Sequence, residues 1–319
     1  MSNIKYIFPI IIIFFMSCNK KVQTEIPDSR TQIINASEIN KKIKKGEDIT
    51  YKNATIMGDI DFTRSNDANI VTANLIKHNV NSSIVFYDCT FKGKITAEKQ
   101  NENFKTISNF NKSVSFINCT FQDTLNFTSS YFKGLVNFSN SMFQKFVNFK
   151  SAIFGLQGMF FNKTHFVKDA KFNLMHVAGN CDFSDAVFDN NILFQLSEFD
   201  NPVFFNAVKF SQNANFTKIK FNDDVFFNYS EFYKTIQFNT SVFRGRTEFI
   251  KSHFNLISEF KNCLFYSNIK FSDAEIYGIF TFENSIFYIS DPNNFKTNIS
   301  KKSDYILKGT IVLSKKEKR

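Results

Sequence analysis

Residues 136–143 read VNFSNSMF, and this unit, with its two phenylalanines five residues apart, recurs along most of the chain. From Phe116 to Phe287 phenylalanine returns at intervals of five and six residues in alternation, which defines sixteen copies of an eleven-residue unit. Thirty of the thirty-two positions are Phe, and the exceptions are Val177 and Ile276. A fixed period of this length is typical of stacked repeats, in which each unit buries its apolar face only against its neighbours.

Within each unit, inward and outward residues alternate. The residue two before each Phe is apolar or small, and the residue between them is usually polar. Side chains in an extended chain alternate between two faces, so each Phe shares the interior with the residue two before it. A helix is excluded, because its apolar stripe would recur every three or four residues. Asn or another turn-prone residue follows many of the phenylalanines, which indicates short strands joined by corners.

This spacing resembles the pentapeptide-repeat family in its Phe-rich form, and residues 181–188 (CDFSDAVF) carry the likeness clearly. The resemblance implies an all-β fold, a right-handed, four-sided parallel β-helix with a solid core and about 22 residues per coil. Sixteen units would form about eight coils, roughly 40 Å long at the usual strand spacing. The first phenylalanine of each pair is expected to form a core ladder, which comprises Phe116, Phe127, Phe138, Phe149, Phe161, Phe172, Phe183, Phe194, Phe205, Phe216, Phe227, Phe238, Phe249, Phe260, Phe271 and Phe282.

One unit breaks the period, because Phe154 and Phe161 are seven residues apart and the interval contains Gly155 and Gly158. Glycine relieves the strain of an extra residue in a stacked strand. We therefore predict a bulge here, with Phe154 and Phe161 inward and Phe160 outward.

Residues 1–17 have the features of a bacterial lipoprotein signal peptide. An apolar run from Tyr6 to Met16, too short to span a bilayer comfortably, is followed by Ser17 and Cys18. Residues 15–18 resemble a lipobox, although Phe and Met stand where Leu and Ala are usual. The resemblance implies cleavage before Cys18 and lipidation of its thiol, and thus a lipid-anchored protein of the bacterial cell envelope. An ordinary signal peptide with a coincidental cysteine is the alternative.

The remaining segments flank the regular β-helix, which is expected over residues 114–290. Residues 18–34 are interpreted as a tether, and residues 35–113 as an N-terminal cap followed by interrupted first coils. The cap begins with a short helix between Asn35 and Gly46. Interruptions at residues 63–82 and 96–112 are predicted to be protruding loops and the contact surface for a partner. Residues 291–319 are expected to form a C-terminal cap and a basic tail.

The net charge of +10 comes from the two ends of the chain. Residues 114–290 contain fifteen basic and fifteen acidic side chains, so the regular part is neutral. Nucleic-acid binding needs a basic structured face, so we expect no nucleic-acid partner. The basic ends are expected instead to be attracted to anionic lipid headgroups. Some pentapeptide-repeat proteins are acidic mimics of DNA that inhibit topoisomerases, and the neutral coils and the export signal disfavour that alternative.

Candidate chemistry is sparse. Cys89, Cys119, Cys181 and Cys263 all lie two residues before a Phe and are expected to be small buried thiols rather than a disulfide or metal framework. His165, His176 and His253 are expected to face solvent and to lie too far apart to share a metal ion. Carboxylates that could form a carbohydrate-cleaving pair are better interpreted as turn formers; they are Asp182, Asp185, Asp189, Asp223 and Asp224. No catalytic residue, cofactor or metal site is predicted.

The leading hypothesis is a rigid, non-catalytic binding scaffold or spacer, anchored to the membrane by lipid, with an unidentified protein or glycan partner in the envelope. A polysaccharide-acting β-helix enzyme of the envelope remains the alternative from a different class. Measurable turnover of any glycan would decide between them.

Overall fold

The computed structural model describes residues 31–289, 305–306 and 308–314. The chain divides at residue 30, and the description below concerns the unit that begins at Thr31. The predicted signal peptide, Cys18 and the first part of the tether therefore lie outside the described residues, as do residues 290–304 and the tail from residue 315.

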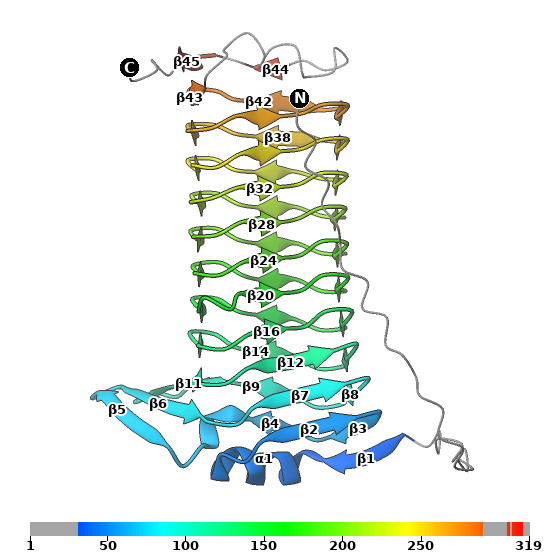
Figure 1. The fold of residues 1–319 in the computed structure, drawn as a ribbon, viewed down its shortest axis with the longest axis vertical. Helices are drawn as coiled ribbons and strands as arrows, with labels where there is room; N and C mark the ends of the chain where they lie inside the picture. Colours follow the sequence, from blue (N-terminus) through cyan, green and yellow to red (C-terminus); the bar gives the residue numbers. More distant parts are fainter. Residues whose placement is uncertain (1–30, 290–304, 307, 315–319) are drawn as a thin grey trace, which may run out of the picture. The chain divides into compact units, whose positions relative to one another are not determined.

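The described chain winds through four sheets in turn, which confirms the predicted four-sided parallel β-helix (Figure 1). One coil runs from β12 (Val114–Ile117) through β13 (Thr120–Phe121), β14 (Leu125–Asn126) and β15 (Tyr131–Phe132) to β16 (Val136–Asn137). Strand β16 pairs in parallel with β12, with Val136 opposite Val114, so one coil comprises 22 residues.

The strands of each sheet follow one another at this interval along most of the stack. Sheet I holds β1 (Gln32–Asn35), β3 (Ala54–Met57), β8 (Thr90–Phe91), β13, β17 (Met142–Phe143), β21 (His165–Phe166), β25 (Val187–Phe188), β29 (Lys209–Phe210), β33 (Glu231–Phe232), β37 (His253–Phe254) and β41 (Glu275–Ile276). Sheet II holds β5 (Ala68–Thr72), β6 (Leu75–Val80), β10 (Glu98–Gln100), β11 (Lys105–Phe110), β15, β19 (Ile153–Phe154), β23 (His176–Val177), β27 (Glu198–Phe199), β31 (Lys220–Phe221), β35 (Val242–Phe243), β39 (Leu264–Phe265), β43 (Ile286–Ile289) and β45 (Ile311–Ser314). Sheet III holds β2 (Ile49–Lys52), β7 (Ile84–Tyr87), β12, β16, β20 (Met159–Phe160), β24 (Cys181–Asp182), β28 (Val203–Phe204), β32 (Val225–Phe226), β36 (Thr247–Glu248) and β40 (Ile269–Lys270). Sheet IV holds β4 (Ile60–Asp61), β9 (Ile95–Thr96), β14, β18 (Val147–Asn148), β22 (Ala170–Lys171), β26 (Ile192–Leu193), β30 (Ala214–Asn215), β34 (Ile236–Gln237), β38 (Ile257–Glu259), β42 (Ile279–Thr281) and β44 (Tyr305–Ile306).

The core consists of phenylalanine columns that run along the stack. The sixteen phenylalanines of the predicted ladder alternate between a column beside sheet III and one beside sheet IV, and all are buried. Within a column the rings stack, as Phe205 does on Phe227 with centroids 4.8 Å apart and planes 5° apart. Between columns they meet edge to face, as Phe205 does with Phe216 at 5.5 Å and 85°. Both arrangements suit the charge distribution of aromatic rings and add to the free energy gained by burial.

Small inner residues before the second Phe of a unit connect adjacent coils. The Ser241 hydroxyl donates to the carbonyl oxygen of Phe216 at 2.9 Å and accepts from the Ile219 N–H at 3.1 Å. Ser197, two coils earlier, makes the same two bonds, to Phe172 and Met175. A buried hydroxyl is costly unless it is hydrogen-bonded, and these bonds also tie one coil to the next.

The corners use asparagine in two ways and accept residues of many types. Asn137, directly before a Phe, accepts from the Ser139 N–H at 2.9 Å, as a turn former does. Each regular unit has one residue with positive φ two positions after its first Phe, and the residue types include Leu174 and Tyr229, at 61° and 62°. Asn directly after the Phe instead links coils, since Asn228 Oδ1 accepts from the Ile250 N–H at 2.8 Å. The stacked coil imposes the left-handed conformation at a cost of about 1 kcal/mol, and the side chain there faces solvent.

The irregular unit forms the predicted bulge. The Gly158 N–H donates to the Gly155 carbonyl oxygen at 3.0 Å, and Gly158 has a φ of 75°. Phe154 and Phe161 are buried on either side of the turn, while Phe160 is turned outward and is half-buried.

A helix covers the open end of the first coil (Figure 1). Helix α1 (Ala36–Lys45) begins at the predicted cap Asn35, which accepts from the Ser37 N–H at 2.9 Å, and it ends at Gly46 in the left-handed region. Its buried face consists of Ala36, Ile39 and Ile43. The cap thus shields strand ends that would otherwise expose unpaired backbone groups.

Two expectations for the segments that flank the regular coils need correction, and a third gains detail. The last residues of the predicted tether form strand β1, because they pair with β3 in parallel. The predicted loops at residues 63–82 and 96–112 are mainly β-hairpins, since β5 pairs antiparallel with β6 and β10 with β11. Within the predicted C-terminal cap, residues 305–306 and 311–314 add parallel strands β44 and β45 to the sheets.

Candidate binding surface

The two hairpins join into a small sheet that projects beyond the four-sided coil, and we call these four strands, β5, β6, β10 and β11, the wing (Figure 1). Strand β6 pairs in parallel with β11 from Leu75–Lys105 to Val80–Phe110. Strand β11 then continues into the stack, where Asn109 and Phe110 pair with β15. The wing is therefore rooted in sheet II, and its free edges are β5 and β10.

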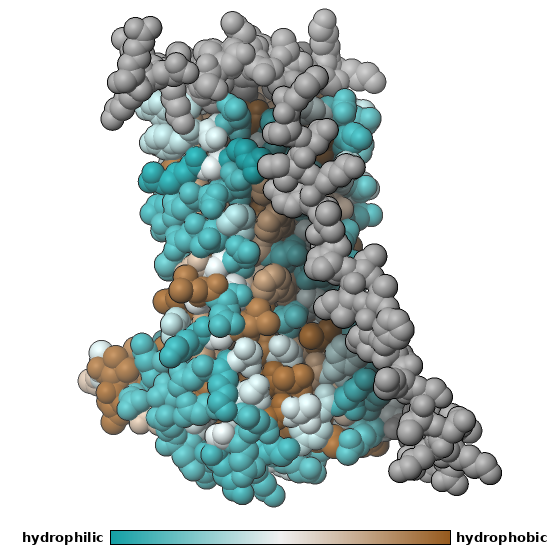
Figure 2. Space-filling view, in the orientation of Figure 1, coloured by the Kyte–Doolittle hydropathy of each residue, from teal (hydrophilic) through white to brown (hydrophobic). Residues whose placement is uncertain are grey.

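The two edges of the wing differ in chemistry. All five residues of β5 are exposed and uncharged, and Ile70 and Val71 are 80 % and 49 % exposed. Strand β10 carries Glu98 and Lys99, both of which have partners inside the chain. Charged side chains commonly protect a strand edge from further pairing, so β10 is protected and β5 is open. Figure 2 shows apolar side chains gathered on this projecting part of the surface.

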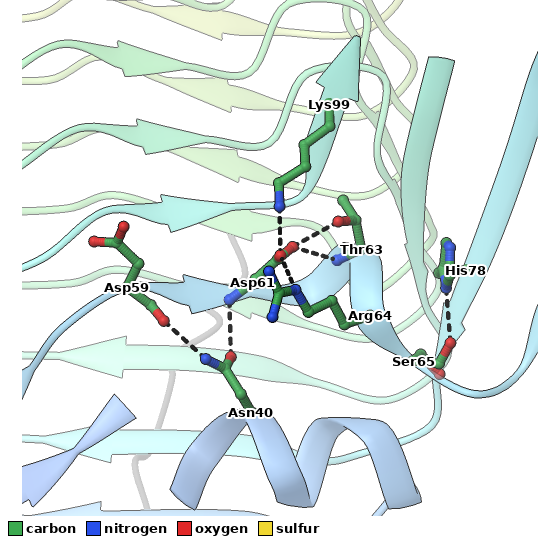
Figure 3. Close-up of polar contacts among 8 residues, drawn as sticks. All are labelled: Asn40, Asp59, Asp61, Thr63, Arg64, Ser65, His78 and Lys99. Carbon is green, nitrogen blue, oxygen red and sulfur yellow. Dashed lines mark hydrogen bonds and ion pairs between the residues drawn. The ribbon is translucent and has the colours of Figure 1, made fainter. Parts of the chain in front are cut away.

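Asp61 connects the wing to the cap (Figure 3). Its carboxylate accepts from Lys99 Nζ of β10 at 2.5 Å and from Arg64 Nε at 2.7 Å. It also accepts from the backbone N–H and the hydroxyl of Thr63, in the 3₁₀ turn η1 (Phe62–Arg64). Asn40 of α1 bonds both the carbonyl oxygen of Asp59 and the N–H of Asp61 along the free edge of β4.

These contacts determine the ionisation of Asp61. Burial raises the pKa of its carboxyl, but the hydrogen bonds from Lys99 and Thr63 and the nearby Lys99 charge together outweigh burial, so the pKa lies below its ordinary value. Asp61 is thus a structural anion that holds helix, turn and wing together. Sequence reasoning did not single it out, because it occupies an ordinary outward polar position directly before Phe62.

The base of the first hairpin is closed by a second set of polar contacts. His78 Nδ1 lies 2.7 Å from the carbonyl oxygen of Ser65, and the Ser65 hydroxyl donates to the carbonyl oxygen of Asn79. The carboxylate of Asp67 accepts from the side-chain amides of Asn79 and Asn81 at 3.0 and 2.9 Å. The wing is therefore fixed at its root, whereas its outer edge has no such contacts described.

The four described cysteines lie inside the coils as free thiols. Hydrogen bonding between the thiols of Cys89 and Cys119, in successive coils, lowers the pKa of Cys89 and raises that of Cys119. Burial raises the pKa of Cys181 and brings that of Cys263 to about 12. None of the four is exposed to solvent.

The three histidines named from the sequence face outward, as expected, but each has a carboxylate partner. His165 Nε2 lies 2.6 Å from Asp189, and His176 Nε2 lies 2.7 Å from Asp200. His253 Nε2 lies 3.4 Å from Glu275. The first two histidines belong to sheets I and II, on opposite sides of the coil.

The candidate acid pairs are engaged in local contacts. Asp182 Oδ1 accepts from the Ser184 N–H at 2.8 Å, as a turn former does. Asp224 receives two bonds from the Arg246 guanidinium, at 2.9 and 2.6 Å. Burial raises the pKa of Asp224, but Arg246 outweighs this effect and lowers it overall.

Neither a metal-binding cluster nor a helix of membrane-spanning length occurs among the described residues. No group of three or more His, Cys, Asp or Glu side chains among them is placed to hold a metal ion. No helix in the described part of the chain is long and apolar enough to cross a membrane.

The chain is similar to a family of known repeats. No curated protein matches the chain. The family described as pentapeptide repeats (9 copies) matches residues 108–153, which run from within β11 to the first residue of β19. Residues 108–153 are thus similar to pentapeptide repeats, and the phenylalanine columns that continue to Phe287 support the same family for the rest of the coil stack.

Proposed function

We propose that this protein is a rigid, non-catalytic binding scaffold of the bacterial cell envelope, and that its wing receives an extended strand of a protein partner at β5. A β-solenoid with pentapeptide repeats suits a structural or binding role in general, because the coils present a fixed surface. The open, uncharged edge of β5 is the observation that carries the proposal. A strand added there would bond its backbone to β5 and cover Ile70 and Val71.

We also propose that the chain is held at the membrane by lipid on Cys18. The apolar run that ends at Met16, followed by Ser17 and Cys18, supports this anchor. Replacing Cys18 with Ala should abolish labelling by radioactive palmitate and move the protein from the membrane fraction to the soluble fraction. Continued labelling of the variant would refute the anchor.

The wing is tested by charging its open edge. Ile70→Lys/Val71→Lys places two cations on β5, where both side chains are already exposed, so the fold should persist. We expect pull-downs from envelope extracts with this double variant to lose the partners captured by the unchanged protein.

A matched control adds the same charge elsewhere. Leu174→Lys/Leu196→Lys changes two exposed corner residues, and the equivalent corners already carry Lys163, Lys218 and Lys251. This control should capture the same partners as the unchanged protein. If both double variants lose the same partners, charge and not the β5 edge controls capture, and the proposal fails.

A further inference from the structure

A groove of about 400 Å³ lies on the outer face of sheet I, far along the stack from the wing. It is lined by Glu231, Tyr233, His253, Asn255, Glu275 and Tyr277. These residues come from three successive coils, because β33, β37 and β41 are neighbours in register. The lining forms two rows along the stack. One consists of Glu231, His253 and Glu275, and the other consists of Tyr233, Asn255 and Tyr277.

The two tyrosines are the main apolar surfaces of the groove. Tyr233 is 41 % exposed and Tyr277 is 60 % exposed, and Asn255 occupies the coil between them. Two coils separate the rings, which is about 10 Å at the usual strand spacing. The hydroxyl of Tyr233 donates to Glu231 Oε2 at 2.7 Å, and that of Tyr277 donates to Glu275. These bonds restrain the two rings, and they raise the pKa of both tyrosines.

The polar groups of the groove are carboxylates, an amide and an imidazole. Carboxylate and amide oxygens accept hydrogen bonds from hydroxyl groups, and the amide of Asn255 and the ring of His253 can also donate. Although Lys209 Nζ lies 5.0 Å from the centre of the Tyr233 ring, the lining itself contains no Lys or Arg, and its two carboxylates repel phosphate, sulfate and uronate groups. The ligand that fits is therefore uncharged, rich in hydroxyl groups and able to place an apolar face on an aromatic ring.

We propose that this groove binds an uncharged polysaccharide, whose sugar rings lie against Tyr233 and Tyr277 and whose hydroxyls bond with Glu231, Asn255 and Glu275. A linear polymer suits the site because the groove is built from a row that repeats along the coil axis. The polysaccharide can then contact both tyrosines at once through two sugar rings that are not adjacent. The site goes beyond the proposed role of the wing, since it assigns a different ligand to a different face.

The test is calorimetric titration of the full chain, in detergent, with uncharged hexasaccharides of β-linked glucose and of β-linked N-acetylglucosamine. Tyr233→Ala and Tyr277→Ala should each weaken binding about tenfold, and the double variant about a hundredfold, if each ring contributes a typical aromatic contact. Tyr233→Phe keeps the ring and should bind nearly as well as the unchanged protein. A disaccharide, too short to reach both rings, should bind more weakly than either hexasaccharide.

The controls separate the groove from general effects. Tyr131→Ala removes a tyrosine that is 38 % exposed on the outer face of sheet II and should leave binding unchanged. Asn255→Arg, which fills the groove without removing a ring, should abolish binding even if an alanine variant fails to fold. Ile70→Lys/Val71→Lys should retain sugar binding, so that the wing and the groove can fail independently.

Three outcomes would overturn the proposal. One is the absence of binding to both hexasaccharides, and another is unchanged binding by Tyr233→Ala/Tyr277→Ala. The third concerns cations, since Lys209 Nζ already lies 5.0 Å from the centre of the Tyr233 ring. Displacement of the sugar by tetramethylammonium at low concentration would assign the rings to a cationic ligand instead.

Discussion

At the scale of single residues, whether a phenylalanine side chain points inward or outward decides how much it contributes to the free energy of unfolding. Phe205 lies in the buried column, while its neighbour Phe204 faces outward and stacks on Phe226 at 5.4 Å. Phe205→Ala should cost about 3–5 kcal/mol, because it leaves a cavity between close-packed rings. Phe204→Ala should cost less than about 1 kcal/mol. Urea unfolding of the two variants measures the difference, and equal losses would contradict the assignment of the core.

At the same scale, the contacts of Asp61 predict that the stability of the wing root depends on pH. A carboxyl whose pKa is lowered by folding stabilises the folded state above its ordinary pKa of 3.8, and this contribution is lost as pH falls through the lower, folded value. Below pH 3.8 the wing root should therefore open before the coils unfold. Limited proteolysis near residues 62–80 at decreasing pH checks this. Asp61→Asn should make cleavage there equally easy at pH 6, whereas Asp185→Asn, at a solvent-facing corner, should not.

At the scale of elements, the two glycines of the bulge between β19 and β20 differ in how well they tolerate substitution. A Cβ at Gly158 would lie 2.1 Å from the carbonyl oxygen of Asn180, and its φ of 75° disfavours other residues. At Gly155 the closest atom, the carbonyl oxygen of Lys133, would be 3.0 Å away, and φ lies outside the left-handed region. Gly158→Ala should therefore lower the urea midpoint clearly and Gly155→Ala much less. The opposite order would show that the extra residue is accommodated elsewhere.

The same elements show how much of the structure can be predicted from the sequence. The period predicts the coil, the columns and the bulge, because each depends on neighbours 22 residues apart. The position of the wing was predicted from the interruptions at residues 63–82 and 96–112, but its strand pairing was not, because these strands pair outside that register: Leu75 lies opposite Lys105, thirty residues later. The left-handed conformation of Leu174 could not be predicted, because the stacked coils impose it against the conformational preference of leucine. The tyrosine groove escaped because its residues gather only when three coils are aligned.

At the scale of the whole coil stack, stability comes from contacts between successive coils. Ring stacking and the serine bridges all join one coil to the next, as between Ser241 and Phe216. Such a molecule is approximately a sum of nearest-neighbour interfaces, so damage should remain local. The wing and the groove, which lie many coils apart, are then held at a fixed separation along the stack axis without direct contact, which is what a scaffold with two binding surfaces requires.

Detaching the N-terminal cap tests whether damage to the stack remains local. Helix α1 buries Ile39 and Ile43 against the first coil, and its Asn40 bonds the edge of β4. Ile39→Asp/Ile43→Asp should detach the helix, expose the edges of β2 and β4, and cause chains to associate, as light scattering would show. Hydrogen exchange should rise in β2 and β4 but stay low around β28 and β32, because those coils keep both neighbours. Lys41→Asp/Lys44→Asp introduces the same acidic side chains on the exposed face of the helix and should change neither measurement. A uniform rise in exchange along the whole stack would mean that the coils unfold as one unit, and the nearest-neighbour account would then be wrong.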